Sequence, residues 1–227
     1  MLLHLNNVSK GYGQPGSHAF RPVLSNLELK LEQGSVTGIT GQSGSGKTTL
    51  LNIAGALDLP DSGEVLFGGE EISRYNDLEL ARFRNLKLGF VFQQHHLMPH
   101  LTLWENVLLP LLPRKRKTLA DDISWAEHLL RKTGIWEQRN QLPGEMSGGE
   151  CQRAAVVRAL INKPALVLAD EPTGALDETN ATILADLLLN LAIEEGVTLL
   201  VVTHATDLAA RLDSRYLLHN GTLKELK

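Results

Sequence analysis

Residues 41–48 read Gly-Gln-Ser-Gly-Ser-Gly-Lys-Thr, which is a complete phosphate-binding loop. A short apolar run at 36–40 leads into this loop, and a helix-favouring run follows at 49–54. The glycines let the backbone turn its N–H groups toward a polyphosphate, and the start of a helix adds a favourable field for an anion. Lys47 would reach the β- and γ-phosphates, and the Thr48 hydroxyl would bind Mg²⁺. The sequence therefore predicts a nucleoside triphosphate site within a strand–loop–helix unit.

Composition excludes several classes of protein. A chain of 227 residues fits one domain, or one domain with an inserted subdomain, and its 43% hydrophobic and 21% charged residues are ordinary for a globular protein. The net charge of −4 argues against general nucleic-acid binding. Cys151 is the only cysteine, so an internal disulfide is impossible and a reducing compartment is expected. The longest apolar run, at 101–112, contains Glu105, Asn106 and Pro110, so we expect no membrane-spanning helix.

The order of apolar patterns predicts an α/β fold. Alternating positions at 3–5 and 24–31 predict two antiparallel strands, joined by a loop at 11–22 that is rich in glycine and proline. Continuous apolar runs predict buried strands of a parallel sheet, at 36–40, 88–92, 166–169 and 199–202. Helical patterns separate these strands, at 47–57, 121–133, 149–161 and 177–193. This alternation favours a three-layer domain with right-handed crossovers.

Two further segments complete the expected organisation. Asn220 and Gly221 predict a tight hairpin between strands at 216–219 and 222–226. The region from 95 to 163 has little strand character, so we interpret it as a helical insertion.

A pair of acids ends the apolar strand at 165–169. In a phosphate-loop protein an acid at such a strand end holds the Mg²⁺ shell, which assigns Asp170. Glu171 points differently and could orient or deprotonate the attacking water. Paired acids at a strand end are otherwise commonly solvated turn residues or a helix cap.

A second glycine-rich turn, Ser147-Gly148-Gly149, runs into a helical pattern. Its backbone N–H groups and the Ser147 hydroxyl form another anion site at a helix start. Two phosphate-binding devices in one chain leave two explanations: either each chain holds two nucleotides, or each nucleotide is shared between two chains.

The order of these motifs resembles the nucleotide-binding subunit of ATP-binding-cassette (ABC) transporters over essentially the whole chain. An aromatic residue precedes the loop, and Gln93, the Ser147-Gly148-Gly149 signature, Asp170-Glu171, Asp177 and His204 follow. The resemblance implies a single ABC ATPase domain over 1–227: a P-loop NTPase (RecA-like) three-layer core with an N-terminal antiparallel β region and an inserted α-helical subdomain. We assign 1–93 and 164–227 to the core and 94–163 to the helical subdomain.

The resemblance also implies a role for each motif residue, with ATP and Mg²⁺ as ligands. Tyr12 would stack on adenine, although a tyrosine packing on its own strand is the alternative. The nucleotide-binding set is Tyr12, Gly41, Gln42, Ser43, Gly44, Ser45, Gly46, Lys47, Thr48, Thr49, Ser147, Gly148, Gly149 and Asp177. The catalytic set is Glu171, His204 and Gln93, and the metal set is Thr48, Gln93 and Asp170. The signature would meet the γ-phosphate held by an opposite chain, and Asp177 would cross that interface, so the active unit would be a head-to-tail dimer that hydrolyses two ATP and drives a partner.

Small departures from the family pattern leave this reading intact. Met146 replaces a leucine in the signature, and Gly174 and Ala205 replace a frequent serine and aspartate. We interpret Cys151 as a semi-exposed thiol that is not a nucleophile.

Within the family, residues 88–99 with 105–112, and residues 169–177, resemble the lipoprotein-releasing cassettes and their macrolide-export and cell-division relatives. The resemblance implies an integral membrane partner with few transmembrane helices, which docks in a cleft beside Gln93, and a peripheral location on the cytoplasmic face of the bacterial inner membrane. The basic run at 114–117 is either a solvated loop or a contact with anionic lipid or an acidic partner. A soluble ABC ATPase of DNA repair or translation, and a scaffold that clamps a membrane complex, remain alternatives.

Overall fold

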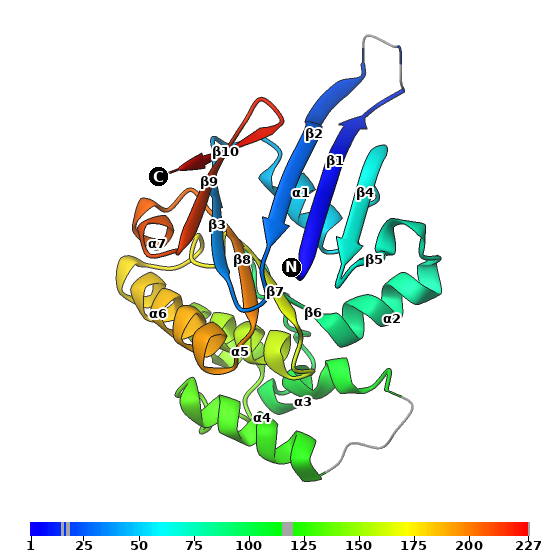
Figure 1. The fold of residues 1–227 in the computed structure, drawn as a ribbon. Helices are drawn as coiled ribbons and strands as arrows, with labels where there is room; N and C mark the ends of the chain where they lie inside the picture. Colours follow the sequence, from blue (N-terminus) through cyan, green and yellow to red (C-terminus); the bar gives the residue numbers. More distant parts are fainter. Residues whose placement is uncertain (15, 17–18, 115–119, 227) are drawn as a thin grey trace.

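The computed structural model describes residues 1–14, 16, 19–114 and 120–226, which form two β-sheets and the helices around them (Figure 1). One sheet has the strand order β2-β1-β4-β5 and is antiparallel. The other has the order β10-β9-β3-β8-β7-β6, and its strands are parallel except for the final hairpin.

The bounds of the elements are as follows. The strands are β1 (Leu3–Tyr12), β2 (Arg21–Leu31), β3 (Val36–Thr40), β4 (Ser62–Phe67), β5 (Glu70–Glu71), β6 (Leu88–Val91), β7 (Leu166–Asp170), β8 (Thr198–Val202), β9 (Ser214–His219) and β10 (Thr222–Leu226). The α-helices are α1 (Lys47–Ala54), α2 (Asp77–Lys87), α3 (Leu103–Leu108), α4 (Ala120–Lys132), α5 (Gly148–Leu160), α6 (Glu178–Glu194) and α7 (Thr206–Ala210). Short 3₁₀ helices are η1 (Ile72–Arg74), η2 (Leu109–Leu111) and η3 (Pro143–Glu145).

The parallel sheet is buried on both faces, which explains why its strands are continuous apolar runs. Successive side chains of a strand point to opposite faces. In β7, Leu166 and Leu168 therefore join α1 and the antiparallel sheet in one hydrophobic core, and Val167 and Ala169 join α5 and α6 in the other. The helix that follows the phosphate-binding loop is thus packed between the two sheets, and α5 and α6 cover the opposite face (Figure 1).

This topology brings the motifs to one edge. The strands β3, β8 and β7 are neighbours and run parallel, so their carboxyl ends meet at the same side of the sheet. The loop at 41–46 follows β3, Asp170 ends β7, and His204 follows β8. Ligands of open α/β sheets bind at this edge.

The expected α/β architecture with a parallel sheet, an N-terminal antiparallel region and a terminal hairpin is confirmed. Asn220 and Gly221 have φ values of 48° and 76°, as a two-residue hairpin of this type requires. The expected helical patterns all form, with shifted ends. The first of them ends at Ala54 rather than 57, because Gly55 caps the helix.

Other expectations about the N-terminal half were wrong or incomplete. The loop at 11–22 is shorter than expected, because Gly11 pairs with Pro22 and Tyr12 with Arg21 in the ladder between β1 and β2. The proline is tolerated since β2 is an edge strand. Sequence patterns also missed β4 and α2. Only Leu80 and Phe83 of α2 are buried, and its other leucines, Leu78 and Leu86, are exposed, so its apolar residues do not mark a single face of the helix.

The insertion at 94–163 contains helices and no strand among its described residues. Its assignment as a separate subdomain stays a prediction. The basic run falls mostly at 115–119, outside the described residues; Arg114 pairs with Asp122 at 2.8 Å. In the described ranges 1–14, 16, 19–114 and 120–226, no helix combines the length and hydrophobicity needed to cross a membrane.

Candidate functional site

The phosphate-binding loop depends on glycine at specific positions. Gly46 immediately precedes α1 with φ 102°, and a Cβ there would lie 2.8 Å from Val23 Cγ1. Gly44 also has a positive φ, of 76°, and a Cβ there would meet nothing within 4 Å. Gly46 is therefore required by close packing, whereas Gly44 leaves the space in front of the loop open.

Lys47 is buried beneath the loop, and its ammonium group bonds backbone carbonyls. Its Nζ donates to Gly41 O at 2.8 Å and to Gln42 O at 3.1 Å. The Ser45 hydroxyl is buried and has no hydrogen-bond partner among the described residues. A buried polar group without a partner is costly, and Ser45 does not line the cavity described below.

Asp170 and Thr48 lie 122 positions apart in the sequence and come into contact in the fold. The Thr48 hydroxyl donates to Asp170 Oδ2 at 3.1 Å. Burial and the neighbouring charge of Glu171 raise the pKa of the Asp170 carboxyl, against the opposing effects of Thr48 and Lys47. A carboxylate and a hydroxyl at the mouth of a phosphate loop are the protein ligands typical of a Mg²⁺ site that is completed by phosphate and water.

Glu171 is held from several directions. Its Oε1 lies 2.8 Å from His204 Nδ1, and its Oε2 accepts from the Thr203 hydroxyl at 3.0 Å and from the His204 N–H at 3.1 Å. Its backbone has φ 45°, which is uncommon for a residue other than glycine. Such strain persists where surrounding contacts over-determine it, and it concentrates at active sites.

A cavity of about 620 Å³ gathers most of the predicted site. Its lining residues are Val23, Gly41, Gln42, Ser43, Gly44, Gly46, Lys47, Thr48, Thr49, Gln93, Asp170, Glu171 and His204. Gln93 packs close to Gly174: a Cβ at residue 174 would lie 3.0 Å from Gln93 Nε2. The residues present fit a magnesium–triphosphate complex: one cation and a glycine loop for the phosphates, with an acid and a hydroxyl for the metal.

The signature turn lies outside this cavity lining. Ser147 begins α5 with a capping box: its hydroxyl accepts from Glu150 N–H at 3.3 Å, and Glu150 Oε2 accepts from Ser147 N–H at 2.8 Å. Hydrogen bonds from the Ser147 backbone and hydroxyl lower the pKa of Glu150. Gly149 packs against Asn180, which also bonds Asp177 at the start of α6. The signature and Asp177 are thus neighbours through one asparagine.

Tyr12 is also absent from the cavity lining, but its hydroxyl reaches the first turn of α1. It lies 3.5 Å from Thr49 Oγ1 and donates to Asp58 Oδ2 at 3.0 Å. The ring stays 45% exposed.

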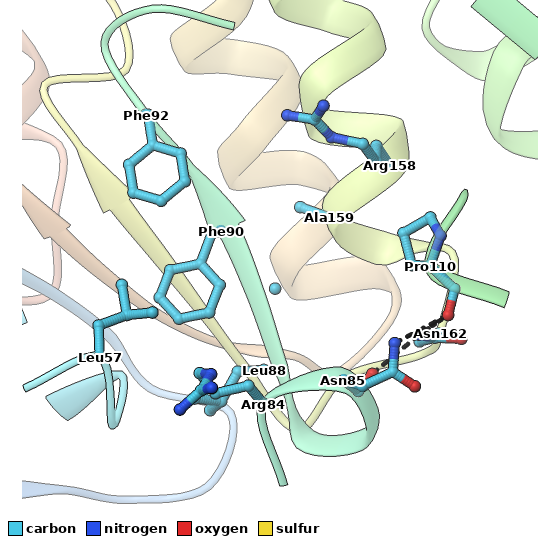
Figure 2. A pocket seen from close by; sticks show the side chains of 11 residues that line it. Leu57, Arg84, Asn85, Leu88, Phe90, Phe92, Pro110, Arg158, Ala159 and Asn162 are labelled. Atoms are coloured by element: carbon cyan, nitrogen blue, oxygen red, sulfur yellow. Dashed lines mark hydrogen bonds between the residues drawn. The ribbon is translucent and has the colours of Figure 1, made fainter. Parts of the chain in front are cut away.

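A second cavity, of about 390 Å³, lies where β6 meets α2 and α5 (Figure 2). Phe90, Phe92 and Leu57 supply its apolar side, and Leu57 is exposed. At one end, the side-chain amides of Asn85 and Asn162 both donate to Pro110 O, at 2.8 and 3.0 Å (Figure 2).

Two residues of α5 tie this helix to the segment that contains Gln93. Gln152 Nε2 donates to Phe92 O at 2.6 Å. The Arg158 guanidinium donates to the carbonyls of His95 and His96, at 2.6 and 2.7 Å. The residues on both sides of Gln93 are therefore hydrogen-bonded to the helix that begins at the signature.

Sequence reasoning missed Thr203, Gln152, Asn180, Asp58 and Val23. A hydroxyl at the end of a buried strand, as at Thr203, was a usable signal beside the histidine. The contacts of the others join residues from distant parts of the chain. The interpretation of Cys151 as semi-exposed was wrong: the side chain is 2% exposed, because α5 turns it into the core.

Comparison with known proteins identifies the family. Residues 24–174 match the family described as ABC transporter. The lipoprotein-releasing system ATP-binding protein LolD 1 of Rhodopirellula baltica is 44% identical over 225 residues, which cover 98% of this chain and 96% of that protein. LolD of Shewanella oneidensis is also 44% identical, over 99% of this chain and 96% of its own.

Solved structures agree. The dimeric MJ0796 cassette in a post-hydrolysis state bound to ADP and Pi superposes with a TM-score of 0.90 at 37% identity, covering 100% of this chain and 98% of that one. A second dimeric MJ0796 structure, described as a bacterial ABC transporter cassette, gives a TM-score of 0.89 at 38% identity, with the same coverage.

The chain belongs to the ABC transporter family. It is an ATP-hydrolysing motor subunit of a membrane ABC transporter, with a P-loop NTPase fold.

Proposed function

We propose that this subunit forms a head-to-tail dimer around two magnesium–ATP complexes and drives lipoprotein release from the bacterial inner membrane. The dimer binds the cytoplasmic face of that membrane through an integral membrane partner with few transmembrane helices. The observation that carries the catalytic part is the convergence of Thr48 on Asp170 at 3.1 Å, with Glu171 next in the chain. The 44% identity to lipoprotein-releasing ATP-binding proteins over nearly the whole length supports the cargo.

In this proposal the loop at 41–46 and Lys47 bind the phosphates, and Thr48, Asp170 and Gln93 would hold the metal. A bound Mg²⁺ would offset the charge of the transferring phosphoryl group. Glu171 accepts a proton from the attacking water as the bond to the ADP oxygen breaks, and His204 contacts the γ-phosphate. The Glu171 Oε2 already accepts from the Thr203 hydroxyl and the His204 N–H, whereas Oε1 has one neighbour, His204 Nδ1, so Oε1 keeps an acceptor position for the water.

The signature acts on the nucleotide of the opposite subunit. Ser147 and Gly149 lie at the start of α5, outside the cavity of their own chain, and Asp177 is linked to them through Asn180. Two solved neighbours are dimeric cassettes, which supports this arrangement.

The cavity in Figure 2 receives a segment of the membrane partner. It is bordered by Phe92, the residue before Gln93, and by Arg158, which bonds the segment after it. Binding of the partner in this cavity and binding of ATP would thereby be coupled through the segment around Gln93 and through α5.

Purification of a tagged Glu171→Gln protein from native membranes with ATP tests the proposal. We expect it to co-purify with lipoproteins and with a membrane subunit that has few transmembrane spans and a large extracytoplasmic part. The Lys47→Ala protein should co-purify with the same membrane subunit, but the amount recovered should not rise when ATP is added. A drug-efflux or division subunit would move the cargo to a sibling. Only DNA-repair or ribosomal proteins would contradict the transporter assignment for this chain.

A further inference from the structure

A network of charged and polar side chains surrounds Tyr12 at the end of β1. Asp58 lies on the loop after α1 and binds on both carboxylate oxygens: Oδ2 accepts from the Tyr12 hydroxyl at 3.0 Å, and Oδ1 accepts from Lys10 Nζ at 2.8 Å. The N–H of Leu59 donates to Oδ1 as well, also at 2.8 Å. The carboxylate therefore has a fixed orientation, set by three donors.

Lys10 is itself fixed. Its Nζ donates to Leu59 O at 2.7 Å and lies 3.6 Å from Asp61, and only 12% of its side chain is exposed. The ammonium group lies 5.5 Å from the centroid of the Tyr12 ring. Burial alone would raise the pKa of Asp58, but the hydrogen bonds from Lys10, Tyr12 and Leu59 outweigh it and the pKa is lowered, so the acceptor of the tyrosine hydroxyl is a carboxylate at neutral pH.

The network joins the ring to the triphosphate cavity. The Tyr12 hydroxyl lies 3.5 Å from Thr49 Oγ1, and Thr49 lines that cavity beside Thr48. The loop that carries Asp58 follows α1 directly, and the N–H groups of Leu57 and Asp58 both bond Asn52 O in this helix. The helix that would hold the phosphates and the ring beside them are thus fixed to each other through one carboxylate.

Tyr12 remains 45% exposed although its hydroxyl is held and the Lys10 ammonium lies over its ring. A tyrosine that is 45% exposed at a strand end would otherwise sample several rotamers, and immobilising it on binding would cost part of the affinity. Holding the hydroxyl in advance removes that cost. This explains why a tyrosine, rather than a phenylalanine, is useful at this position.

We infer that Asp58, fixed by Lys10, is a positioning residue for the nucleotide base: it orients the Tyr12 ring for stacking through the ring hydroxyl. The inference rests on the proposed function, in which Tyr12 stacks on adenine. It adds that base affinity depends on a residue that touches neither the base nor the phosphates.

Steady-state hydrolysis by the full chain tests this, with the KM for ATP and kcat measured separately. One net hydrogen bond of this kind corresponds to a KM rise of about threefold to tenfold. We expect that rise for Asp58→Ala with kcat unchanged, and a similar rise in KM for Tyr12→Phe, which removes only the hydroxyl. The double variant should be no worse in KM than Asp58→Ala, because both changes break one contact.

Two controls separate local from general effects. Inhibition by tripolyphosphate, which has no base, should be the same in wild type and Asp58→Ala. The variant Asp61→Ala removes the other acid of the loop, which bonds Gly11 N–H at 2.7 Å and lies 3.6 Å from Lys10 Nζ, so it loosens the loop and one Lys10 contact while the bond from the Tyr12 hydroxyl to Asp58 is kept. It should leave KM closer to wild type than Asp58→Ala does.

Each outcome decides between the assignments. Additive effects of Tyr12→Phe and Asp58→Ala, or weaker tripolyphosphate inhibition in Asp58→Ala, would overturn the positioning role and make the network structural. An unchanged KM in Asp58→Ala, with a raised KM in Tyr12→Ala, would overturn the inference and leave the stacking role intact. An unchanged KM in Tyr12→Ala would overturn both the positioning role of Asp58 and the stacking role of Tyr12. The phosphate-binding loop is tested independently by Lys47→Ala.

Discussion

The two glycine-rich turns of this chain differ in how their polar groups are satisfied. In the phosphate-binding loop, Lys47 bonds only backbone carbonyls and the Ser45 hydroxyl has no partner among the described residues. In the signature turn, Ser147 and Glu150 satisfy each other in a complete capping box. The polar groups of the first turn can still bind a ligand, whereas those of the second are already satisfied as the N-terminus of a helix.

This difference shows why both turns look like anion sites in sequence but play unequal parts in one chain. The cavity at the first turn contains two acids, Asp170 as the proposed metal ligand and Glu171 as the proposed base. The second presents Gly148, where a Cβ would meet nothing within 4 Å, so its outer surface is open. The comparison favours sharing of each nucleotide between two chains over two complete sites per chain.

The largest expected effect is on the base of the first site. Glu171→Gln removes the proton acceptor but keeps the shape, so turnover should fall by about 10²- to 10⁴-fold, as for loss of a general base. ATP binding should remain, and a dimer should accumulate with ATP. Phosphate release and gel filtration measure the two effects. The matched change Glu178→Gln, at an exposed position of α6, should leave turnover unaltered; normal turnover in Glu171→Gln would remove Glu171 as the base.

Lys47→Ala tests the binding half of the same site. Hydrogen bonds to a charged group contribute about 1.5–3 kcal/mol each, so ATP affinity should fall about tenfold to a hundredfold. Calorimetric titration measures it, and Lys30→Ala, at an exposed lysine of β2, is the control. Unchanged affinity would contradict the assignment of the loop.

The signature turn should behave in the opposite way. Ser147→Arg adds a large side chain at the open surface, so ATP binding should persist while the ATP-stable dimer is lost in the Glu171→Gln background. Loss of the cap also destabilises α5 by about 1 kcal/mol, which Ser147→Ala measures alone as a lower melting temperature. Gly148→Ala is the sharper control: outside its own helical turn, a Cβ at this position would meet no atom of the described residues within 4 Å, so a weaker dimer with normal stability would locate the partner there. A stable dimer from Ser147→Arg would contradict the shared-site arrangement.

Sequence patterns predicted the strands of the parallel sheet well because burial on both faces makes each a continuous apolar run. The motifs together with the family resemblance named every residue that lines the cavity at the phosphate-binding loop except Val23. Patterns failed for α2, whose only buried residues are Leu80 and Phe83 and whose start is defined by a capping box at Asn76 and Glu79. A helix exposed over most of its surface has a weak apolar period.

Contacts between distant residues could not be predicted either. The bond from Gln152 to Phe92 spans 60 residues, and that from Tyr12 to Asp58 spans 46. Each requires the fold to be known first. The same holds for Cys151, whose position in the motif says nothing about which face of α5 is buried.

That thiol provides the smallest test of the comparison, because it reports whether the signature helix is as fixed as its capping box suggests. Burial, and secondarily the charge of Glu150, raise the pKa of Cys151, and its Sγ lies 3.5 Å from Pro143 O. At pH 8 the native thiol therefore has a smaller thiolate fraction than an exposed cysteine, and the reagent cannot reach it without opening of α5. Alkylation by N-ethylmaleimide should be at least about tenfold slower in the native protein than in denaturant, and its rate should keep rising at pH values where an exposed cysteine has levelled off. Equal alkylation rates in the native and denatured protein would mean that the first turn of α5 opens readily. The signature would then need a ligand to become ordered, as the phosphate-binding loop does.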